Sequence, residues 1–176
     1  MGRRHRAMTG AVVWLTGLPS CGKSTLAAKL LSRLRSEHLP AVVLDGDEVR
    51  AALVPAKGYT AAERESFYAT LANLAALLAR QGAIAIVAAT ASRRAFRDRA
   101  RSLSPRFLEV HLDVPEQECR RRDAKGLYAR AARGEARDVP GADAVYEPPI
   151  EPEVVARGGE DAEALQRILQ RLHGWA

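Results

Sequence analysis

The chain has 176 residues, of which 47% are hydrophobic and 27% are charged, a size and balance typical of one soluble globular domain. Its net charge of +6 suits a small anionic substrate better than nucleic acid, because no basic stripe is interleaved with aromatic residues. Two cysteines exclude a disulfide framework, and no apolar run is long enough to span a membrane. We therefore expect a cytoplasmic protein without a membrane segment.

A basic tail opens the chain. Residues 1–10 include Arg3, Arg4 and Arg6 and lack the apolar core of a secretory signal. This composition predicts a disordered tail, followed by a single domain over residues 11–176.

A strand, a glycine loop and a helix are predicted in that order at the start of the domain. Residues 11–16 are apolar, and the loop that follows reads Gly-Leu-Pro-Ser-Cys-Gly-Lys-Ser, the G-x-x-x-x-G-K-S spacing of a P-loop. The helix is expected to run to about Glu37, with Leu26, Leu30 and Leu34 on its buried face. This context favours binding of a nucleoside triphosphate over a simple glycine-rich turn.

The chemistry of phosphate binding indicates a role for the residues of this loop. Its backbone N–H groups would point at phosphate oxygens, Lys23 would reach the β- and γ-phosphates of ATP, and Ser24 would ligate Mg²⁺. Cys21 is interpreted as a small space-filling residue rather than a redox group. The predicted ATP-contacting residues are Gly17, Leu18, Pro19, Ser20, Cys21, Gly22, Lys23, Ser24 and Thr25.

Strands and helices alternate through the rest of the chain. Further strands are predicted over residues 41–44, 83–88, 107–112 and 154–155, and further helices over 61–81, 93–102, 115–122 and 161–172. The alternation predicts an α/β fold, the three-layer P-loop NTPase fold, with a central mostly parallel sheet and helices on both faces. Strand 41–44 is expected to be buried, and Leu71, Leu74 and Leu78 to point inward. Residues 123–149, rich in Arg, Gly, Ala and Pro, predict a mobile lid.

Three segments are expected to meet at the carboxyl ends of the strands, where open α/β sheets bind ligands. They are the P-loop, residues 45–50 and residues 90–94. Phosphoryl transfer needs positioning and charge neutralisation, and one carboxylate suffices to orient or deprotonate a hydroxyl. Asp45-Gly46-Asp47 alone is equally compatible with a tight turn, but beside a P-loop it predicts an active-site element.

Six short blocks carry a resemblance to a known family. They are residues 14–18, 44–50, 122–128, 132–135, 141–143 and 146–148. Together they resemble the adenylylsulfate kinases, P-loop kinases that phosphorylate the 3′-hydroxyl of adenosine 5′-phosphosulfate (APS) with MgATP. The resemblance covers about residues 13–152, most of the chain. It implies that the substrate is a small anion and that the protein forms a homodimer.

The resemblance also implies residue roles. Lys23, Asp47 and Lys125 would be catalytic: Asp47 would face the acceptor hydroxyl, and Lys125 would approach the phosphates or the acceptor when the lid closes. Arg50 would grip the phosphosulfate end of APS. Tyr59 would stack on its adenine. The predicted substrate-contacting residues are Asp47, Arg50, Tyr59, Arg64, Phe67, Thr90, Ala91 and Lys125.

This chain departs from the family pattern on the acceptor side. Phe67 stands where the family has an acceptor-contacting asparagine, Ala69 and Thr70 stand where it has arginines, and Ala91 stands where it has a serine. These changes leave open an alternative, a diverged relative that phosphorylates a sugar or a nucleoside-like metabolite. Phe67, Ala91 and a cluster of Arg93, Arg94 and Arg97 favour that alternative. A nucleotide-binding module without catalysis is a third hypothesis.

Overall fold

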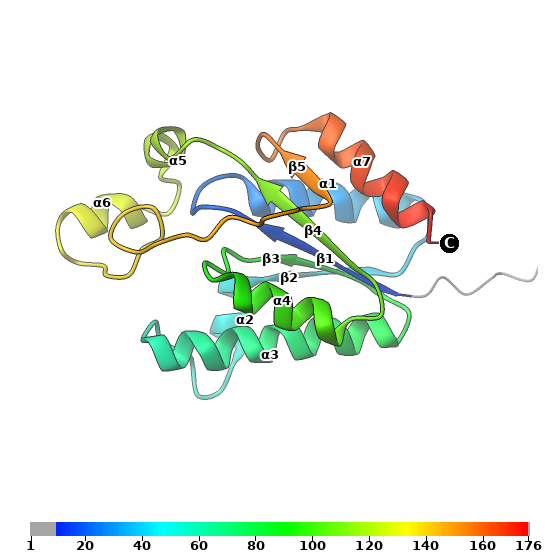
Figure 1. The fold of residues 1–176 in the computed structure, drawn as a ribbon, viewed down its shortest axis with the longest axis horizontal. Coiled ribbons are helices and arrows are strands. Elements are labelled where there is room, and N and C mark those ends of the chain that lie inside the picture. Colours follow the sequence, from blue (N-terminus) through cyan, green and yellow to red (C-terminus); the bar gives the residue numbers. More distant parts are fainter. Residues whose placement is uncertain (1–9, 176) are drawn as a thin grey trace, which may run out of the picture.

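A five-stranded, all-parallel sheet forms the centre of the computed structural model, which describes residues 10–175 (Figure 1). Its strand order is β2-β3-β1-β4-β5. The strands are β1 (Ala11–Thr16), β2 (Ala41–Asp45), β3 (Ile84–Ala88), β4 (Phe107–Leu112) and β5 (Val154–Ala156). The tail prediction for residues 1–10 lies outside the described residues, apart from Gly10.

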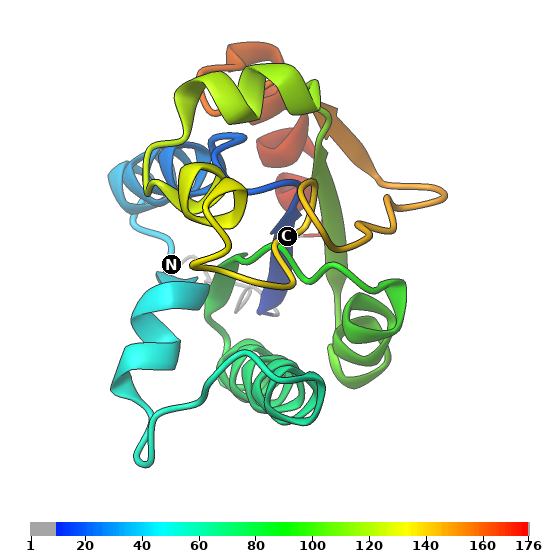
Figure 2. The same cartoon turned by 90° about the vertical axis from the view of Figure 1, so that its left-hand side faces the viewer.

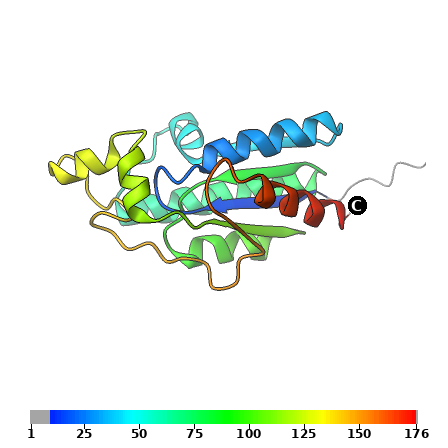
Figure 3. The same cartoon turned by 90° about the horizontal axis from the view of Figure 1, so that it is seen from above.

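Helices cover both faces of the sheet. The helices are α1 (Lys23–Ser36), α2 (Gly46–Ala52), α3 (Ala61–Arg80), α4 (Arg94–Leu103), α5 (Glu116–Arg122), α6 (Leu127–Ala132) and α7 (Ala162–His173). Helices α1 and α7 lie on the face that Figure 3 shows from above, and α3 and α4 lie on the opposite face. The three-layer α/β fold predicted from the alternation is therefore confirmed.

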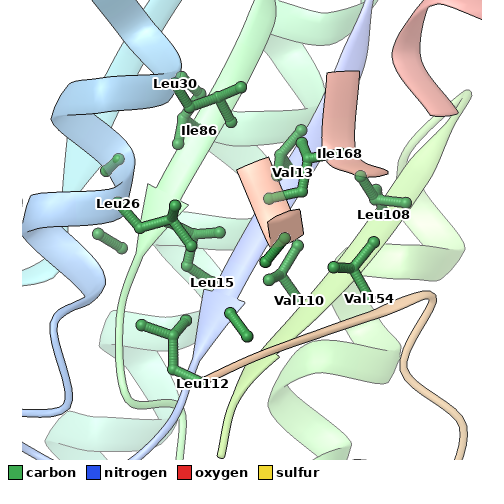
Figure 4. Packing of buried hydrophobic residues seen from close by; sticks show 14 of the residues in the cluster. Val13, Leu15, Leu26, Leu30, Ile86, Leu108, Val110, Leu112, Val154 and Ile168 are labelled. Carbon is green, nitrogen blue, oxygen red and sulfur yellow. The ribbon is translucent and has the colours of Figure 1, made fainter. Parts of the chain in front are cut away.

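The central strand β1 supplies both cores. Val13 and Leu15 pack with α1 and α7 on one face (Figure 4), whereas Val12 and Trp14 pack with α3 and α4 on the other. All six residues of β1 are buried, as expected of a parallel strand covered on both faces. The predicted buried face of α1, formed by Leu26, Leu30 and Leu34, is confirmed.

Two burial predictions are wrong in part. Strand β2 is only half-buried, because it lies at the edge of the sheet beside β3 alone. In α3, Leu71 is buried and Leu78 is partly buried against the core, as predicted, whereas Leu74 is only partly buried and is not part of that core. Small side chains take the inward face of α3 instead, namely Ala72, Ala75, Ala76 and Ala79.

Two short helices were not predicted. Helix α2 begins directly after β2, and the Asp45 side chain caps it by accepting a hydrogen bond from the Asp47 N–H at 3.0 Å. Helix α6 lies inside the segment predicted as the lid. Helix α2, of seven residues, lies in the segment interpreted as an active-site element, and α6, of six residues, lies in a segment whose Arg, Gly, Ala and Pro content indicated a lid.

Candidate active site

A cavity of about 1530 Å³ opens at the carboxyl ends of the strands, the end that faces the viewer in Figure 2. The P-loop, α2, the start of α3, the residues after β3, the lid segment and the loop after β5 line it. Thirteen of the residues predicted from the sequence are among its lining: Pro19, Ser20, Gly22, Lys23, Ser24, Thr25, Asp47, Arg50, Tyr59, Arg64, Phe67, Thr90 and Lys125. Gly17, Leu18, Cys21 and Ala91 are not part of it.

The P-loop is shaped by a close backbone contact. Gly22 has a φ of +102°, and a Cβ there would lie 2.5 Å from the backbone nitrogen of Gly159. The Lys23 ammonium donates hydrogen bonds to the carbonyls of Gly17 at 3.0 Å and Leu18 at 2.8 Å. Cys21 is fully buried, which fits the space-filling interpretation of its side chain. The loop therefore holds its lysine at the cavity wall.

Two oxygen-bearing side chains meet beside the P-loop. The Ser24 hydroxyl donates a hydrogen bond to the Asp45 carboxylate at 2.7 Å. Asp45 ends β2 and Ser24 is the second residue of α1, so the folding of the sheet brings together residues that are far apart in the sequence. Hydroxyl and carboxylate oxygens are the ligands that Mg²⁺ prefers.

The lid segment reaches Asp47. The Lys125 ammonium forms an ion pair with the Asp47 carboxylate, and both side chains remain more than half exposed. The hydrogen bond to Asp47 raises the pKa of Lys125 above its ordinary value, so this lysine stays protonated near neutral pH. The pair places a fixed positive charge beside the carboxylate that faces the cavity.

On one wall of the cavity, two aromatic rings and two guanidinium groups contact one another in an alternating series. The Arg50 guanidinium carbon lies 3.7 Å from the centre of the Phe67 ring and 4.5 Å from that of Tyr59. The Arg64 guanidinium carbon lies 5.6 Å from the same Tyr59 centre. We call these four residues the stacked wall. Contacts of this kind between a cation and an aromatic face are attractive.

Two predictions about the acceptor side need correction. Ala91 is fully buried: its N–H donates to the Tyr68 hydroxyl at 3.0 Å, and its carbonyl accepts from Arg97, so its side chain does not reach the cavity. Arg97 is 1% exposed and pairs with Glu109 at 2.7 Å instead of facing a ligand. Arg93 and Arg94 lie outside the lining as well, paired with Glu65 and Glu147 respectively.

The predicted lid segment lies across the cavity from the sheet. The Tyr128 hydroxyl donates to the Pro19 carbonyl at 3.2 Å, and the Arg64 guanidinium donates to the Asp138 carbonyl at 2.7 Å. Arg130 and Arg137 of this segment also line the cavity, as does Arg122 at the end of α5. The segment therefore contacts the P-loop and the stacked wall and adds positive charge.

One group of lining residues was missed in the sequence. Arg157, Gly158 and Gly159 follow β5, Glu160 and Asp161 lead into α7, and Gly159 packs against Gly22. The sequence did contain an indication of these residues. A Gly-Gly pair follows the last predicted strand, and loops after parallel strands lie at the same edge of the sheet, where ligands bind.

Among residues 10–175, every helix falls short of the length and apolar character that crossing a membrane demands.

Comparisons with known proteins agree with this geometry. A family model described as adenylylsulphate kinase matches residues 9–157. An adenylyl-sulfate kinase of Synechococcus sp. (strain JA-3-3Ab) is 39% identical over 179 residues, which cover 99% of both chains. A probable bifunctional SAT/APS kinase 2 of Sorangium cellulosum (strain So ce56) is 42% identical over 167 residues, which are 94% of this chain but only 29% of that enzyme.

A solved structure gives the same result. The APS kinase of Mycobacterium tuberculosis in complex with AMPPNP and APS matches with a TM-score of 0.87 at 35% identity, over 94% of this chain and 98% of that chain. The family match spans well over half of the sequence, and full-length relatives exceed 30% identity. The chain belongs to the adenylylsulfate kinase family.

Proposed function

We propose that this chain transfers the γ-phosphate of ATP to the 3′-hydroxyl of APS, which gives 3′-phosphoadenosine 5′-phosphosulfate and ADP. One observation carries the proposal: a single cavity has the P-loop on one wall and Asp47 with the stacked wall on another. Its volume of about 1530 Å³ exceeds the roughly 300–1,000 Å³ of a pocket for one small ligand. The names of full-length relatives support the same activity.

Lys23 and the backbone of the P-loop would hold the phosphates of ATP. In the structure the Lys23 ammonium donates hydrogen bonds to two carbonyls of its own loop. When ATP binds, phosphate oxygens would replace these carbonyls as its acceptors. Charge that develops on the transferring phosphoryl group is stabilised by fixed cations more than it would be in water.

Ser24 and Asp45 would hold Mg²⁺. Their 2.7 Å contact joins a hydroxyl and a carboxylate, which fits the preference of Mg²⁺ for one or two protein oxygens with waters and substrate phosphates as its other ligands. Within residues 10–175 there is no cluster of three or more metal-ligating side chains, and this binding mode requires none. When bound, the ion would supply charge neutralisation to the phosphates.

Asp47 would orient the acceptor hydroxyl and take its proton as the oxygen–phosphorus bond forms. The proton passes to the carboxylate and then to water, while ADP carries away the charge of the broken bond. Lys125, paired with Asp47, would contribute positive charge at the place where the phosphoryl group is transferred. Both groups are exposed to the cavity, which leaves them accessible to an incoming acceptor.

The alternative acceptor, a sugar or nucleoside-like metabolite, loses two of its three supports. Ala91 and the Arg93–Arg94–Arg97 cluster do not line the cavity, so only Phe67 remains as a departure among the lining residues, and its ring is almost fully buried behind Arg50. We therefore keep APS as the proposed acceptor.

The test is release of ADP from MgATP in a coupled assay, with and without APS. Turnover that depends on APS at low micromolar concentration supports the proposal. ATP binding with no stimulation by APS would overturn it, and a screen of other hydroxyl metabolites would then separate another acceptor from a module without catalysis.

Two further features stay predictions. The resemblance to the family implies a homodimer, which light scattering after size exclusion would reveal as twice the 19.1 kDa chain mass. A cytoplasmic location is the other, and fractionation of cells that express the protein would check it.

A further inference from the structure

Arg50 is almost buried and has an unusual environment for a cation. Its side chain is 8% exposed, and within residues 10–175 no carboxylate lies within ion-pairing distance of it. One terminal nitrogen, Nη1, donates to the carbonyls of Gly58 at 2.6 Å and Lys57 at 3.4 Å. The other donors, on Nε and Nη2, have no acceptor in the described part of the chain, and Arg50 lines the cavity. These donors are therefore free to take an anion.

Phe67 is held firmly behind Arg50. Its ring is 1% exposed and packs edge-on against Tyr68 at 5.2 Å, and Tyr68 in turn stacks on Phe96 at 4.5 Å. Because this aromatic group is part of the core between the sheet and α3, the Phe67 ring has little freedom to move. Almost none of its surface is left for direct contact with a ligand.

The two rings restrict the movement of the guanidinium. Its carbon lies over the Phe67 ring and over the Tyr59 ring, so movement away from either ring loses cation–π attraction, and its N–H groups lie in the guanidinium plane. An arginine side chain that is free to rotate loses entropy when it binds an anion, whereas one already fixed does not. The rings of Phe67 and Tyr59 therefore remove part of that cost before a ligand arrives.

We propose that Phe67 is a positioning residue for the acceptor: its ring holds the Arg50 guanidinium in the plane in which the free N–H groups receive the acceptor's anionic group. This inference rests on the proposed function. It gives a role to Phe67, which replaces the asparagine of the family pattern. An asparagine there would offer an amide to the acceptor but no aromatic face to Arg50. In this chain, an ordered arginine substitutes for that polar contact.

Steady-state kinetics with APS and ATP test the role. Phe67→Leu keeps an apolar side chain but removes the ring, and we expect it to raise the KM for APS about tenfold. The KM for ATP should change less than twofold, and Phe67→Tyr should restore the KM for APS. Partial unfolding lowers kcat and leaves KM unchanged, so it cannot imitate this result. Phe107→Leu, which removes a ring from the same core far from the cavity, is the matched control.

A double-mutant cycle ties the effect to Arg50. In an Arg50→Lys background, which lacks the planar fork, Phe67→Leu should raise the KM for APS no more than twofold further. An equal tenfold effect in both backgrounds would overturn the inference, as would a KM for APS that stays within twofold of wild type in the single Phe67→Leu variant.

Arginine side-chain NMR of the ligand-free protein separates this inference from the proposed function. The Phe67 ring should shift the Arg50 Nε–H resonance, and Phe67→Leu should move that resonance toward the position of an exposed arginine. If wild-type protein does not turn over APS, the proposed function fails, and this spectrum still decides whether Phe67 positions Arg50. An unmoved resonance contradicts the inference whatever the acceptor is.

Discussion

Lys23 and Asp47 bring opposite charges to one cavity from the first turns of two different helices, α1 and α2. For Lys23→Ala we expect turnover to fall about 10²-fold or more, because the lost charge acts most strongly on the transition state. Single-turnover kinetics under saturating ATP and APS would measure the change. Arg35→Ala, an exposed arginine on α1 that does not line the cavity, is the control, and full activity of Lys23→Ala would remove the lysine from the mechanism.

The second residue prediction concerns Asp47. Asp47→Asn should keep ATP affinity within a fewfold of wild type and lower phosphoryl transfer about 10²-fold or more, because an amide cannot take the hydroxyl proton. Calorimetric titration with an ATP analogue and the coupled assay measure the two properties separately. Glu48→Gln, on the next and exposed residue of α2, should behave as wild type. A normal rate in Asp47→Asn would assign the proton to another group.

At the residue scale, the sequence predicted best where function depends on local spacing. The P-loop needs only its own eight residues and the strand and helix beside it, so the position of Lys23 and Ser24 in the cavity wall could be predicted from sequence alone, while their roles stay predictions. Ala91 and Arg97 could not, because their orientation depends on partners such as Tyr68 and Glu109 that are distant in sequence. Burial of a single side chain is decided by tertiary packing, which spacing does not report.

At the element scale, the segment over residues 123–149 combines exposed arginines with anchored points: Tyr128 and Val139 are buried in the core, and Tyr146 hydrogen-bonds with Thr16. Tyr128, Lys125 and Asp138 attach it to the P-loop, Asp47 and Arg64, and Arg130, Arg133 and Arg137 are exposed within it. If it is a mobile lid, trypsin should cleave it readily in the free protein. An ATP analogue together with APS should slow that cleavage several-fold, because ligands would add contacts to the closed segment.

Mass spectrometry of the fragments would identify the cleaved bonds. Cleavage after the exposed Arg171 at the end of α7 serves as an internal control, since ligands in the cavity should leave it unaffected. Equal cleavage of the lid segment with and without ligands would argue against lid closure.

The elements themselves were largely predictable, with physical reasons for the exceptions. Long helices such as α3 show their period, and α3 also begins with a capping box between Thr60 and Glu63. Helices α2 and α6 were missed because residues 45–50 were interpreted as an active-site element and residues 123–149 as a lid, and neither segment shows a clear apolar period. The half-buried state of β2 was missed because a central strand and an edge strand can have the same apolar composition. The order of strands in the sheet cannot be predicted from the sequence of one strand.

At the scale of the whole molecule, an ion-pair network joins α4, β4 and the segment before β5. Arg101 binds Glu153 at 2.6 Å and 3.0 Å, and Arg97 binds Glu109 at 2.7 Å. Burial alone would raise the pKa of Glu153, but hydrogen bonds from Arg101 and from the Glu109 N–H outweigh it, so this pKa lies below its ordinary value of 4.5. A lowered carboxylate pKa adds stability above the unfolded-state pKa, and that stability is lost as pH falls through the folded-state pKa.

We therefore expect Glu153→Gln to cost about 1 kcal/mol or more at pH 7, or about 2–4 °C in Tm. The difference from wild type should narrow as pH falls below 4.5. Thermal unfolding of both proteins between pH 7 and pH 3 would measure this. Glu65→Gln, at an exposed pair with Arg93, should change Tm little at any pH. A difference for Glu153→Gln that does not depend on pH would show that the charge contributes nothing to it.

The contact of Gly22 with Gly159 also bears on how the protein is made. The phosphate loop is synthesised among the first residues of the domain, but the glycines that pack against it follow the last strand, β5. Because a chain leaves the ribosome from its amino end, the phosphate loop emerges long before Gly159 does. During translation the contact that packs against the phosphate loop therefore forms only when nearly the whole domain has emerged, so we expect ATP to stabilise mainly the nearly finished chain.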